Sequence, residues 1–442
     1  MYLCGVKRYM MCPVDRTHAP EIHDFTQFKP EEPETCVLGN GITLKQFFNP
    51  QLDLLHFSIK IKAGTLFENK KNVAVFCYLL LKESSKLHSS NEVDEFLDYY
   101  GVNYTASIAL EYVTINLIIP KQNCPTVLPY VFDFLLHPTF KVQNIEILRK
   151  RKLMDLAYNR EKVSYCASQL MLHHFFGNSC TVGKQLDEHD LESITAEDLH
   201  QYHQKSFCAE NIRLFAAGNL NEEICGLLAQ LFETIPHGQP SIAPTLPSHR
   251  IEATAPIVDQ HEDCMQSALY LYQPSIGYNH PQRMDFSVLA TILGGYFGSR
   301  LMGNLRETNG YTYGVSCDSL YFAGTSLFYI ESEVNVSTTI QAIDECYNEI
   351  ERLSQEPVRP EELQLVQHYM AGQLIRKVDN TVSYMTQYSR WDDYGCEEGE
   401  FERQMHRIMT FGSEKTVKLA QAWLQRKNFT TIVAGTLEPV HR

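Results

Sequence analysis

Histidine is the side chain that most often binds a metal ion or transfers a proton near neutral pH, and the sequence contains 17 of them. Two histidines one helical turn apart on the same helix face can hold a zinc ion, with a neighbouring glutamate as general base. In sequences this arrangement appears as HxxEH or HExxH. No histidine of this chain stands in either context. The sequence therefore predicts no zinc centre of this kind.

Two histidine pairs are weaker candidates for metal chemistry. His200 and His203 are three residues apart and could share a metal ion, but their surroundings, TAEDLHQYHQ, are typical of an ordinary amphipathic surface helix. His173 and His174 are adjacent, so their rings leave a helix in different directions. An enzyme that uses these histidines is one hypothesis, and ordinary helix residues are the simpler interpretation.

An arginine and a tyrosine in the second half of the chain could hold a polar ligand. Arg306 and Tyr313 stand seven residues apart in the segment LRETNGYTYG. A guanidinium group stays charged and its planar fork suits carbonyl and carboxylate oxygens, while a phenol hydroxyl can donate one hydrogen bond. The structural alternative is a cation at a helix C-terminus and an aromatic residue at the start of a strand. The residue types and their spacing alone leave both interpretations open.

Length and composition limit the classes of protein to which the chain can belong. Its 442 residues suit two to three domains, and its net charge of −15 argues against nucleic acid as a partner. The sequence contains no apolar run of about 18 residues, which is the length needed to span a membrane. The N-terminal residues lack the apolar core of a secretory signal, and the 13 cysteines are scattered without CxxC pairs. We therefore expect a cytoplasmic protein with reduced thiols.

The elements that must position these residues repeat along the chain. Each half begins with a strand-like alternation and continues through a long apolar helix, over 72–84 and 284–305, to a glycine-bearing turn. Each half then closes on a similar strand, AAGNL in the first and VAGTL in the second. Four prolines between 235 and 247 exclude a central strand there and predict a linker.

The predicted fold class is α+β, with two homologous domains related by an internal repeat. Each domain is expected to be an antiparallel or mixed sheet with helices packed on one face. The expected division of the chain is an N-terminal extension over 1–35, a first domain over 36–235, a linker over 236–250 and a second domain over 251–442.

The order of these segments resembles the pitrilysin/insulinase-type metallopeptidases, the inverzincin family, and in particular the two-domain subunits of mitochondrial processing peptidase. The first half contributes KAGTLFE, LLHPTF, SITAEDLHQYHQKSF and AAGNL, and the second contributes GGYFGSRLMGNLRETNGYTYGVS. Each phrase is short, but their order and spacing extend from about Cys36 to the C-terminus. The resemblance implies a zinc peptidase fold with a peptide-binding chamber.

Active members of that family carry HxxEH on the helix after the first strand, and a later helix supplies one more glutamate ligand. The resemblance places Val75 and Leu79 at the two histidine positions, Tyr78 at the glutamate and Asp155 near the downstream ligand. Valine and leucine cannot bind zinc, and a tyrosine with a pKa near 10 is a poor base at neutral pH. Asp155 alone is more simply a solvated or salt-bridged residue. We expect a degenerate zinc site, with no bound metal and no other cofactor.

The resemblance gives Arg306 and Tyr313 a substrate-binding role. In the family such a pair contacts carbonyl groups at or beside the scissile bond, and the substrate adds as a strand to an exposed sheet edge. Gly294, Gly295 and Gly298 resemble a glycine-rich element of noncatalytic processing-peptidase subunits, although ordinary turn glycines explain them nearly as well.

We therefore expect a noncatalytic, substrate-binding subunit of a heterodimeric zinc peptidase that acts on peptides. A zinc-bearing partner of the same family would supply HxxEH. The chain alone, for which a homodimer is one expected form, is not expected to be active. The alternative is a non-proteolytic peptide-binding or scaffold protein of the same fold.

Overall fold

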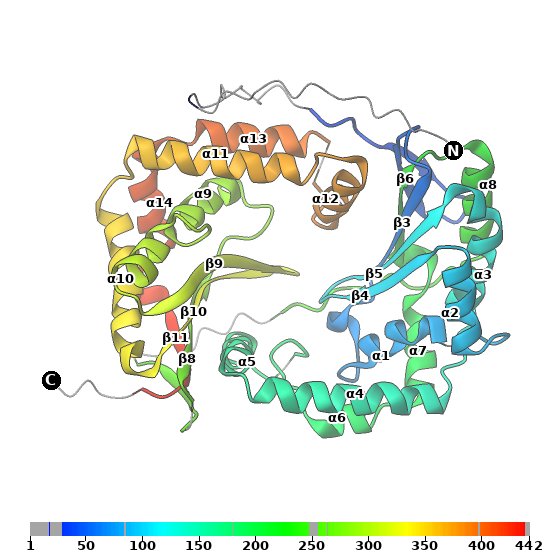
Figure 1. Ribbon diagram of the computed structural model, residues 1–442, viewed down its shortest axis with the longest axis horizontal. Helices are drawn as coiled ribbons and strands as arrows, with labels where there is room; N and C mark the ends of the chain where they lie inside the picture. Colours follow the sequence, from blue (N-terminus) through cyan, green and yellow to red (C-terminus); the bar gives the residue numbers. More distant parts are fainter. Residues whose placement is uncertain are drawn as a thin grey trace, which may run out of the picture.

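The computed structural model describes residues 17, 29–83, 85–178, 180–246, 255–262, 264–396 and 398–437. Most of the expected N-terminal extension, and the end of the expected linker with the first residues after it, lie outside the described residues. The described chain forms two sheets, each with helices packed on it, as two halves of the molecule (Figure 1). The α+β fold class predicted from the sequence is confirmed.

The first sheet has six strands in the order β1-β2-β6-β3-β5-β4. Only β2 and β6 run parallel among these neighbours. Gly41, in the turn between β1 and β2, has a φ of 86°, in the region that favours glycine. The strands are β1 (Glu34–Val37), β2 (Thr43–Phe48), β3 (Leu54–Ile61), β4 (Asn103–Ile108), β5 (Val113–Pro120) and β6 (Ile212–Gly218).

The second sheet has five strands in the order β7-β11-β8-β10-β9. Its one parallel pair, β7 and β11, occupies the place that β2 and β6 occupy in the first sheet. The strand order and the directions therefore repeat, as the similar halves of the sequence predict. The strands are β7 (Ile257–Gln260), β8 (Gln266–Pro274), β9 (Thr312–Phe322), β10 (Thr325–Asn335) and β11 (Thr430–Gly435).

The helices of the first half include one whose start the sequence indicates clearly. Thr195 accepts a hydrogen bond from the backbone N–H of Asp198, whose side chain accepts one from the Thr195 N–H in return, which completes a capping box. The helices are α1 (Val73–Leu79), α2 (Ser90–Tyr99), α3 (Cys124–Leu136), α4 (Val142–Arg160), α5 (Val163–Phe176), α6 (Glu188–Glu192), α7 (Ala196–Ser206) and α8 (Glu222–Phe232), with the short 3-10 turns η1 (Thr65–Phe67), η2 (Leu81–Glu83), η3 (Lys121–Asn123) and η4 (Ala209–Asn211).

The long helix predicted over 284–305 is interrupted. It ends at Leu293 because Gly294 and Gly295 follow, and glycine favours a helix end over a helix interior. A separate π-helical segment, η5, resumes after the interruption. The helices of the second half are α9 (Arg283–Leu293), η5 (Met302–Thr308), α10 (Thr339–Gln355), α11 (Pro360–Arg376), α12 (Thr381–Asp393), α13 (Glu400–Thr410) and α14 (Thr416–Trp423), with the 3-10 turns η6 (Val336–Thr338), η7 (Ser413–Lys415) and η8 (Arg426–Asn428).

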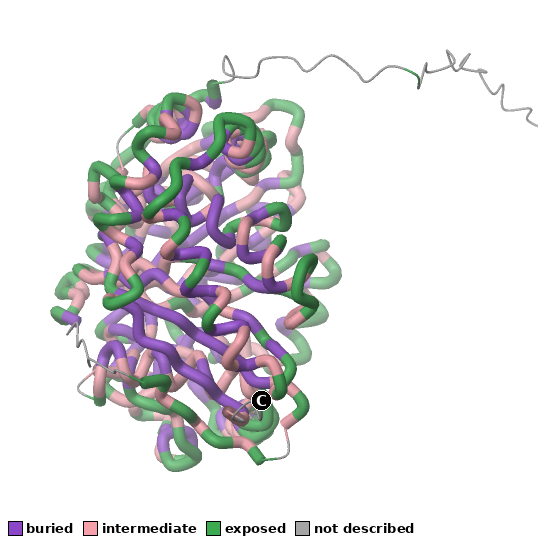
Figure 2. The backbone as a smooth tube through the Cα atoms, turned by 90° about the vertical axis from the view of Figure 1, so that its left-hand side faces the viewer, coloured by how far each residue is buried: buried purple, intermediate pink, exposed green. Residues whose placement is uncertain are grey.

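Each sheet buries one face against helices of its own half. Leu214 and Ala216 of β6 belong to the core of the first half, and Leu269 and Leu271 of β8 belong to the core of the second. Buried residues follow these strands through the middle of the molecule, and exposed residues lie mostly around it (Figure 2).

The opposite face of each sheet packs on a helix from the other half. On β6, Phe215 belongs to one apolar cluster with Tyr384 of α12. On β8, Tyr270 belongs to another with Phe175 of α5. Successive side chains of a strand point to opposite faces, so these residues alternate with those of the two main cores. The halves therefore exchange α5 and α12, which lie between the two sheets in Figure 1.

A buried charged cluster accompanies α12 at this contact. Lys60 of β3 forms an ion pair with Asp393, and Arg213 of β6 pairs with both Asp392 and Asp393 at the end of α12. The guanidinium carbon of Arg213 lies 4.8 Å from the ring centroid of Tyr112. Removal of one partner from such a cluster leaves a buried charge without compensation.

We expect the substitution Asp393→Ala to lower the free energy of unfolding by about 3 kcal/mol, because Lys60 stays buried without its carboxylate. Urea-induced unfolding followed by circular dichroism measures the effect. The control Asp98→Ala removes an exposed carboxylate from α2 and should change stability by less than about 0.5 kcal/mol. Equal, small effects of the two substitutions would contradict the importance of the cluster.

Two further expectations concern membranes and thiols. Among the described helices, none has the length and apolar composition needed to cross a membrane. The described cysteines are free thiols. The cytoplasmic location stays a prediction.

Candidate functional site

The residues at the two histidine positions of the family motif lie on α1, and neither offers a metal ligand. Val75 and Leu79 are one helical turn apart, as the motif requires, but both are half-buried hydrocarbon side chains. Leu79 packs against the core of the first half. The helix therefore keeps the geometry of a zinc-binding helix and fills it with packing residues.

Tyr78, at the position of the general base, is fully buried. Its hydroxyl lies 2.8 Å from Ser206 Oγ, and its ring meets the ring of Tyr202 edge-on. The hydroxyl of Tyr202 in turn donates to the carbonyl oxygens of Ala63 and Gly64. Burial raises the pKa of Tyr78 well above its ordinary value, so the group stays a neutral phenol. Tyr78 is a core residue and cannot act as a base.

Asp155 lies on α4 with a side chain that is 52% exposed, and it forms an ion pair with Lys152 at 3.6 Å. The two residues are three positions apart on one helix face, where such pairs are common. The geometry matches the simpler interpretation of a salt-bridged surface residue.

The histidine pairs also have structural roles. His203 is buried, which corrects the expectation of a surface helix, and its Nε2 lies 2.8 Å from the carbonyl oxygen of Leu135. Burial lowers the pKa of His203 to about 4, so the ring is neutral. His173 Nδ1 lies 2.9 Å from the carbonyl oxygen of Gly183. None of the four histidines joins a group of three close donor atoms within the described part of the chain.

Glu68 is a buried carboxyl group that the sequence analysis did not select. It accepts hydrogen bonds from the backbone N–H groups of Asn72 and Ala74 at the start of α1. Burial raises the pKa of Glu68 to about 7, against the opposing effect of these two donors. It borders a cavity of about 730 Å³ that Lys205 also lines. An acidic residue just before a helix is the sequence signal that could have identified it.

Arg306 lies on η5, a π-helical segment, and such segments occur frequently at functional sites. Its guanidinium carbon is 4.5 Å from the ring centroid of Phe297, and its Nε is 3.6 Å from a carboxylate oxygen of the adjacent Glu307. The side chain is 35% exposed. A stacked, partly exposed arginine keeps donors available for a ligand.

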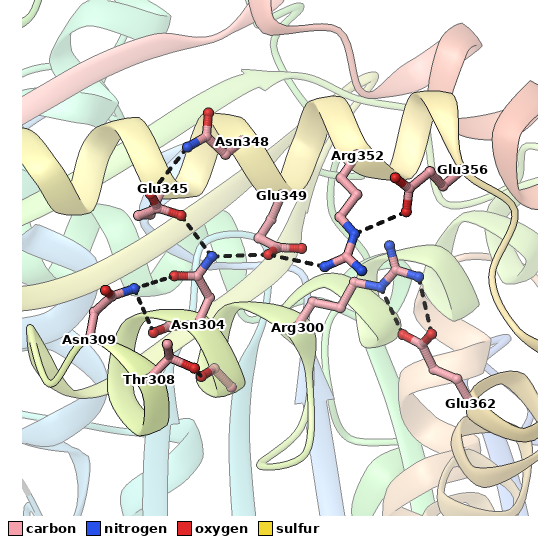
Figure 3. A network of polar contacts seen from close by, with 11 residues as sticks. Arg300, Asn304, Thr308, Asn309, Glu345, Asn348, Glu349, Arg352, Glu356 and Glu362 are labelled. Carbon is pink, nitrogen blue, oxygen red and sulfur yellow. Dashed lines mark hydrogen bonds and ion pairs between the residues drawn. The ribbon is translucent and has the colours of Figure 1, made fainter.

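A polar network holds η5 in place (Figure 3). The Asn304 amide donates to Glu345 at 2.8 Å and to Glu349 at 3.0 Å, both on α10. Just before η5, Arg300 donates two parallel hydrogen bonds to Glu362 of α11, at 2.7 and 3.1 Å. Bidentate pairs of this kind fix orientation as well as distance. The segment that carries Arg306 is therefore anchored at two points.

Tyr313 lies at the start of β9 and is 90% exposed. It lines a cavity of about 910 Å³, together with Gly294, Gly295 and Phe297. Arg306 is not among the lining residues, although Phe297, on whose ring its guanidinium group stacks, is one of them. Tyr313 therefore lies in the cavity wall, and Arg306 contacts one residue of that wall, Phe297.

Close packing explains why glycine occupies positions 294 and 295 beside this cavity. A Cβ atom on Gly294 would lie 2.9 Å from Cys317 Sγ, and one on Gly295 would lie 2.7 Å from Thr291 Cα. Both distances are too short for a side chain to fit without movement. Close packing therefore explains this pair without a ligand, and a ligand contact stays a hypothesis.

The cavity wall is acidic on its strand side. Asp318 of β9 and Glu331 and Glu333 of β10 line it. The carboxylate of Glu331 accepts hydrogen bonds from the hydroxyl groups of Tyr270 and Ser316. Such a wall attracts positively charged groups.

Both sheets end in strands with one partner each among the described residues. β9 pairs with β10, and β4 pairs with β5. In Figure 1 both edge strands lie on the inner sides of the two halves. An edge strand offers unpaired N–H and C=O groups to an added peptide strand.

Comparisons with known proteins agree with this fold. Residues 49–186 match the family described as insulinase (peptidase family M16), and residues 193–370 match the peptidase M16 inactive domain. An uncharacterized zinc protease of Streptomyces coelicolor is 20% identical, over 90% of this chain and 88% of that protein. A probable mitochondrial-processing peptidase subunit beta of Schizosaccharomyces pombe is 21% identical, over 61% of this chain and 60% of that protein. A peptidase M16 inactive domain from Pseudomonas fluorescens superposes with a TM-score of 0.83 at 18% identity, over 92% of this chain and 100% of that one.

The chain therefore belongs to peptidase family M16. The resemblance to this family that the sequence shows is therefore confirmed. On α1 the positions of the family's zinc motif carry Val75, Tyr78 and Leu79, and the match to the inactive domain begins after this helix, at residue 193.

We expect Glu68→Gln to change how stability depends on pH. Glu68 releases its proton near pH 4.5 when the chain is unfolded and near pH 7 when it is folded. The unfolded state therefore binds fewer protons between these values, and this group makes the wild type less stable as pH rises from about 4.5 to 7, by up to about 3 kcal/mol. The glutamine variant lacks this loss.

Unfolding by urea at several pH values between 4 and 8 measures the difference between the two proteins. The variant Glu95→Gln, at an exposed position of α2, serves as the control and should follow the wild type. Parallel stability curves for the wild type and Glu68→Gln would show that Glu68 titrates normally.

We expect Tyr78→Phe to lower the free energy of unfolding by about 1 kcal/mol, because the buried hydrogen bond to Ser206 is lost. Tyr99→Phe removes a hydroxyl group from an exposed ring and should have no measurable effect. Thermal or urea unfolding distinguishes the two. A stability of Tyr78→Phe equal to that of the wild type would contradict the structural role assigned to this hydroxyl.

Proposed function

We propose that this chain is the noncatalytic, substrate-binding subunit of a heterodimeric zinc peptidase that acts on peptides. A zinc-bearing M16 partner would supply the metal ligands and the general base. This chain would supply Arg306, Tyr313 and part of the substrate chamber. The observation that carries the proposal is a contrast: the zinc positions on α1 are packing residues, whereas Tyr313 stays exposed in a cavity wall.

The surroundings of Arg306 support a ligand-binding role. Its nearest carboxylate, on Glu307, is 61% exposed and lies 3.6 Å away, so the ion pair is weak. Rotation away from Phe297 would free the guanidinium donors to bind a peptide carbonyl group. A carbonyl oxygen that gains negative charge during hydrolysis binds such a donor more strongly, which is how a noncatalytic chain can accelerate the reaction of its partner.

The class of peptide follows from the edge strand and the acidic wall. An added strand would receive main-chain hydrogen bonds from an unpaired edge, so that its sequence matters little at most positions. Asp318, Glu331 and Glu333 would favour Lys or Arg side chains of the peptide. We therefore propose a basic, extended peptide as the substrate.

The partner and the location belong to the same proposal. A homodimer would contain two degenerate zinc sites and two copies of the Arg306 and Tyr313 pair. It would therefore bind peptide without cleaving it. A heterodimer with a zinc-bearing chain combines both sets of residues. The free thiols expected of the chain suit the reducing cytoplasm, which is the proposed location.

We expect Arg306→Ala to reduce kcat/KM of the reconstituted heterodimer by about 100-fold, because one donor to the developing oxyanion is lost. Tyr313→Phe should reduce it by about 10-fold, since its hydroxyl is a neutral donor. The assay measures cleavage of a basic fluorogenic peptide by this chain mixed with a zinc-bearing M16 chain from the same organism.

The matched controls are Arg151→Ala, at an exposed position of α4, and Tyr99→Phe, at an exposed position of α2. Both should leave kcat/KM unchanged. Gel filtration verifies that every variant still forms the heterodimer. Full activity of both Arg306→Ala and Tyr313→Phe would reject the substrate-binding role and favour a non-proteolytic scaffold.

A further inference from the structure

Three donor atoms meet where the two halves of the molecule join. Cys166 Sγ, a carboxylate oxygen of Asp259 and a ring nitrogen of His261 all lie within 4.8 Å of one another. Cys166 lies on α5, a helix of the first half, whereas Asp259 is on β7 and His261 directly follows it. Within the described residues this is the one group of three such donors, and it is separate from the degenerate zinc positions on α1.

We propose that Cys166, Asp259 and His261 form a zinc-binding site that joins α5 to β7. Thiolate, imidazole and carboxylate are the donors that Zn²⁺ takes in proteins, and a soft sulfur ligand disfavours Mg²⁺ and Ca²⁺. Zinc requires a fourth ligand for tetrahedral coordination. The side chains of His261 and Asp259 are 28% and 46% exposed, so a water molecule can reach the fourth position.

The main chain around the site is held by contacts that do not involve the donor atoms. The N–H of His261 donates to the carbonyl oxygen of Gly435 at 3.1 Å. The carbonyl oxygen of His261 accepts a hydrogen bond from the Thr436 hydroxyl at 2.8 Å. On the other side, Ala167, next to Cys166, is buried in the cluster that α5 forms with the second sheet. Binding would therefore need small rotations of side chains only.

The charges of the site suit a divalent cation. His261 Nε2 lies 3.3 Å from a carboxylate oxygen of Asp259, and the thiol of Cys166 donates to the carbonyl oxygen of Arg160 at 3.3 Å. Zinc would displace the thiol proton to solvent, and the thiolate and the carboxylate then balance the charge of the ion.

The position of the site suggests what the metal does. One ligand belongs to the helix that crosses from the first half, and the other two lie on β7 and directly after it, in the sheet on which this helix packs and at its end. A bound ion would fasten the exchanged helix to that sheet. Because the three ligands come together only in the folded chain, zinc would stabilise the folded state.

The experiment uses the full chain, stripped of metal with a chelator and titrated with Zn²⁺ alone. We expect one equivalent to bind, a rise in the thermal unfolding midpoint with zinc, and thiolate-to-cobalt absorption in the near ultraviolet when Co²⁺ replaces zinc. Cys166→Ser and His261→Ala should each weaken zinc binding by at least about 100-fold, because each removes a direct ligand.

The control is Cys225→Ser, which removes a half-buried thiol that bonds to Gln46 elsewhere in the first half. It should bind zinc as the wild type does. Asp259→Asn, which keeps the side-chain shape, tests the site if another variant fails to fold. Absence of a zinc equivalent in the wild type, or wild-type affinity in Cys166→Ser and His261→Ala, would overturn the proposal. Neither result depends on a partner chain or on peptide cleavage.

Discussion

The exchange of α5 and α12 between the two halves is the contact on which the rest of the structure depends. Each sheet has one face covered by its own helices and part of the other covered by a helix from the opposite half. The cavity beside Tyr313 borders this contact, because Ser164 at the start of α5 is among its lining residues, although the others belong to the second half. A loss of the packing would remove the contribution of α5 to this cavity wall.

The two halves have diverged in chemistry while keeping one strand order. On α1, a helix with the spacing of a zinc motif has become part of a core, and a tyrosine hydroxyl bonded to Ser206 occupies the position of the general base. On η5, by contrast, hydrogen bonds from the Asn304 amide to two carboxylates of α10 hold the segment that carries Arg306. Arg306 is partly exposed on this anchored segment and Tyr313 is exposed on the neighbouring strand β9, and we propose on this basis that they bind a ligand.

Local patterns predicted much of the fold, because they depend on residues close together in the chain. The turn at Gly41 and the capping box at Thr195, for example, are each formed by neighbouring residues. The exchange of helices could not be predicted, since an amphipathic pattern shows that a helix is buried but not against which sheet. The burial of Glu68 could not be predicted either, because it depends on tertiary packing. Nor could the proximity of Cys166 and His261, because the two residues are distant in the sequence. The glycine pair at 294–295 ends the helix predicted over 284–305 at Leu293.

The account is tested most directly by peptide hydrolysis with the purified chain alone and with its partner. The chain, supplied with excess zinc, should cleave a basic fluorogenic peptide no faster than buffer, because no side chain on α1 can activate water. Addition of a zinc-bearing M16 chain should produce cleavage that is faster than that of the added chain by itself. Zinc-dependent cleavage by this chain alone, or no gain on mixing, would contradict the assignment of a noncatalytic substrate-binding subunit.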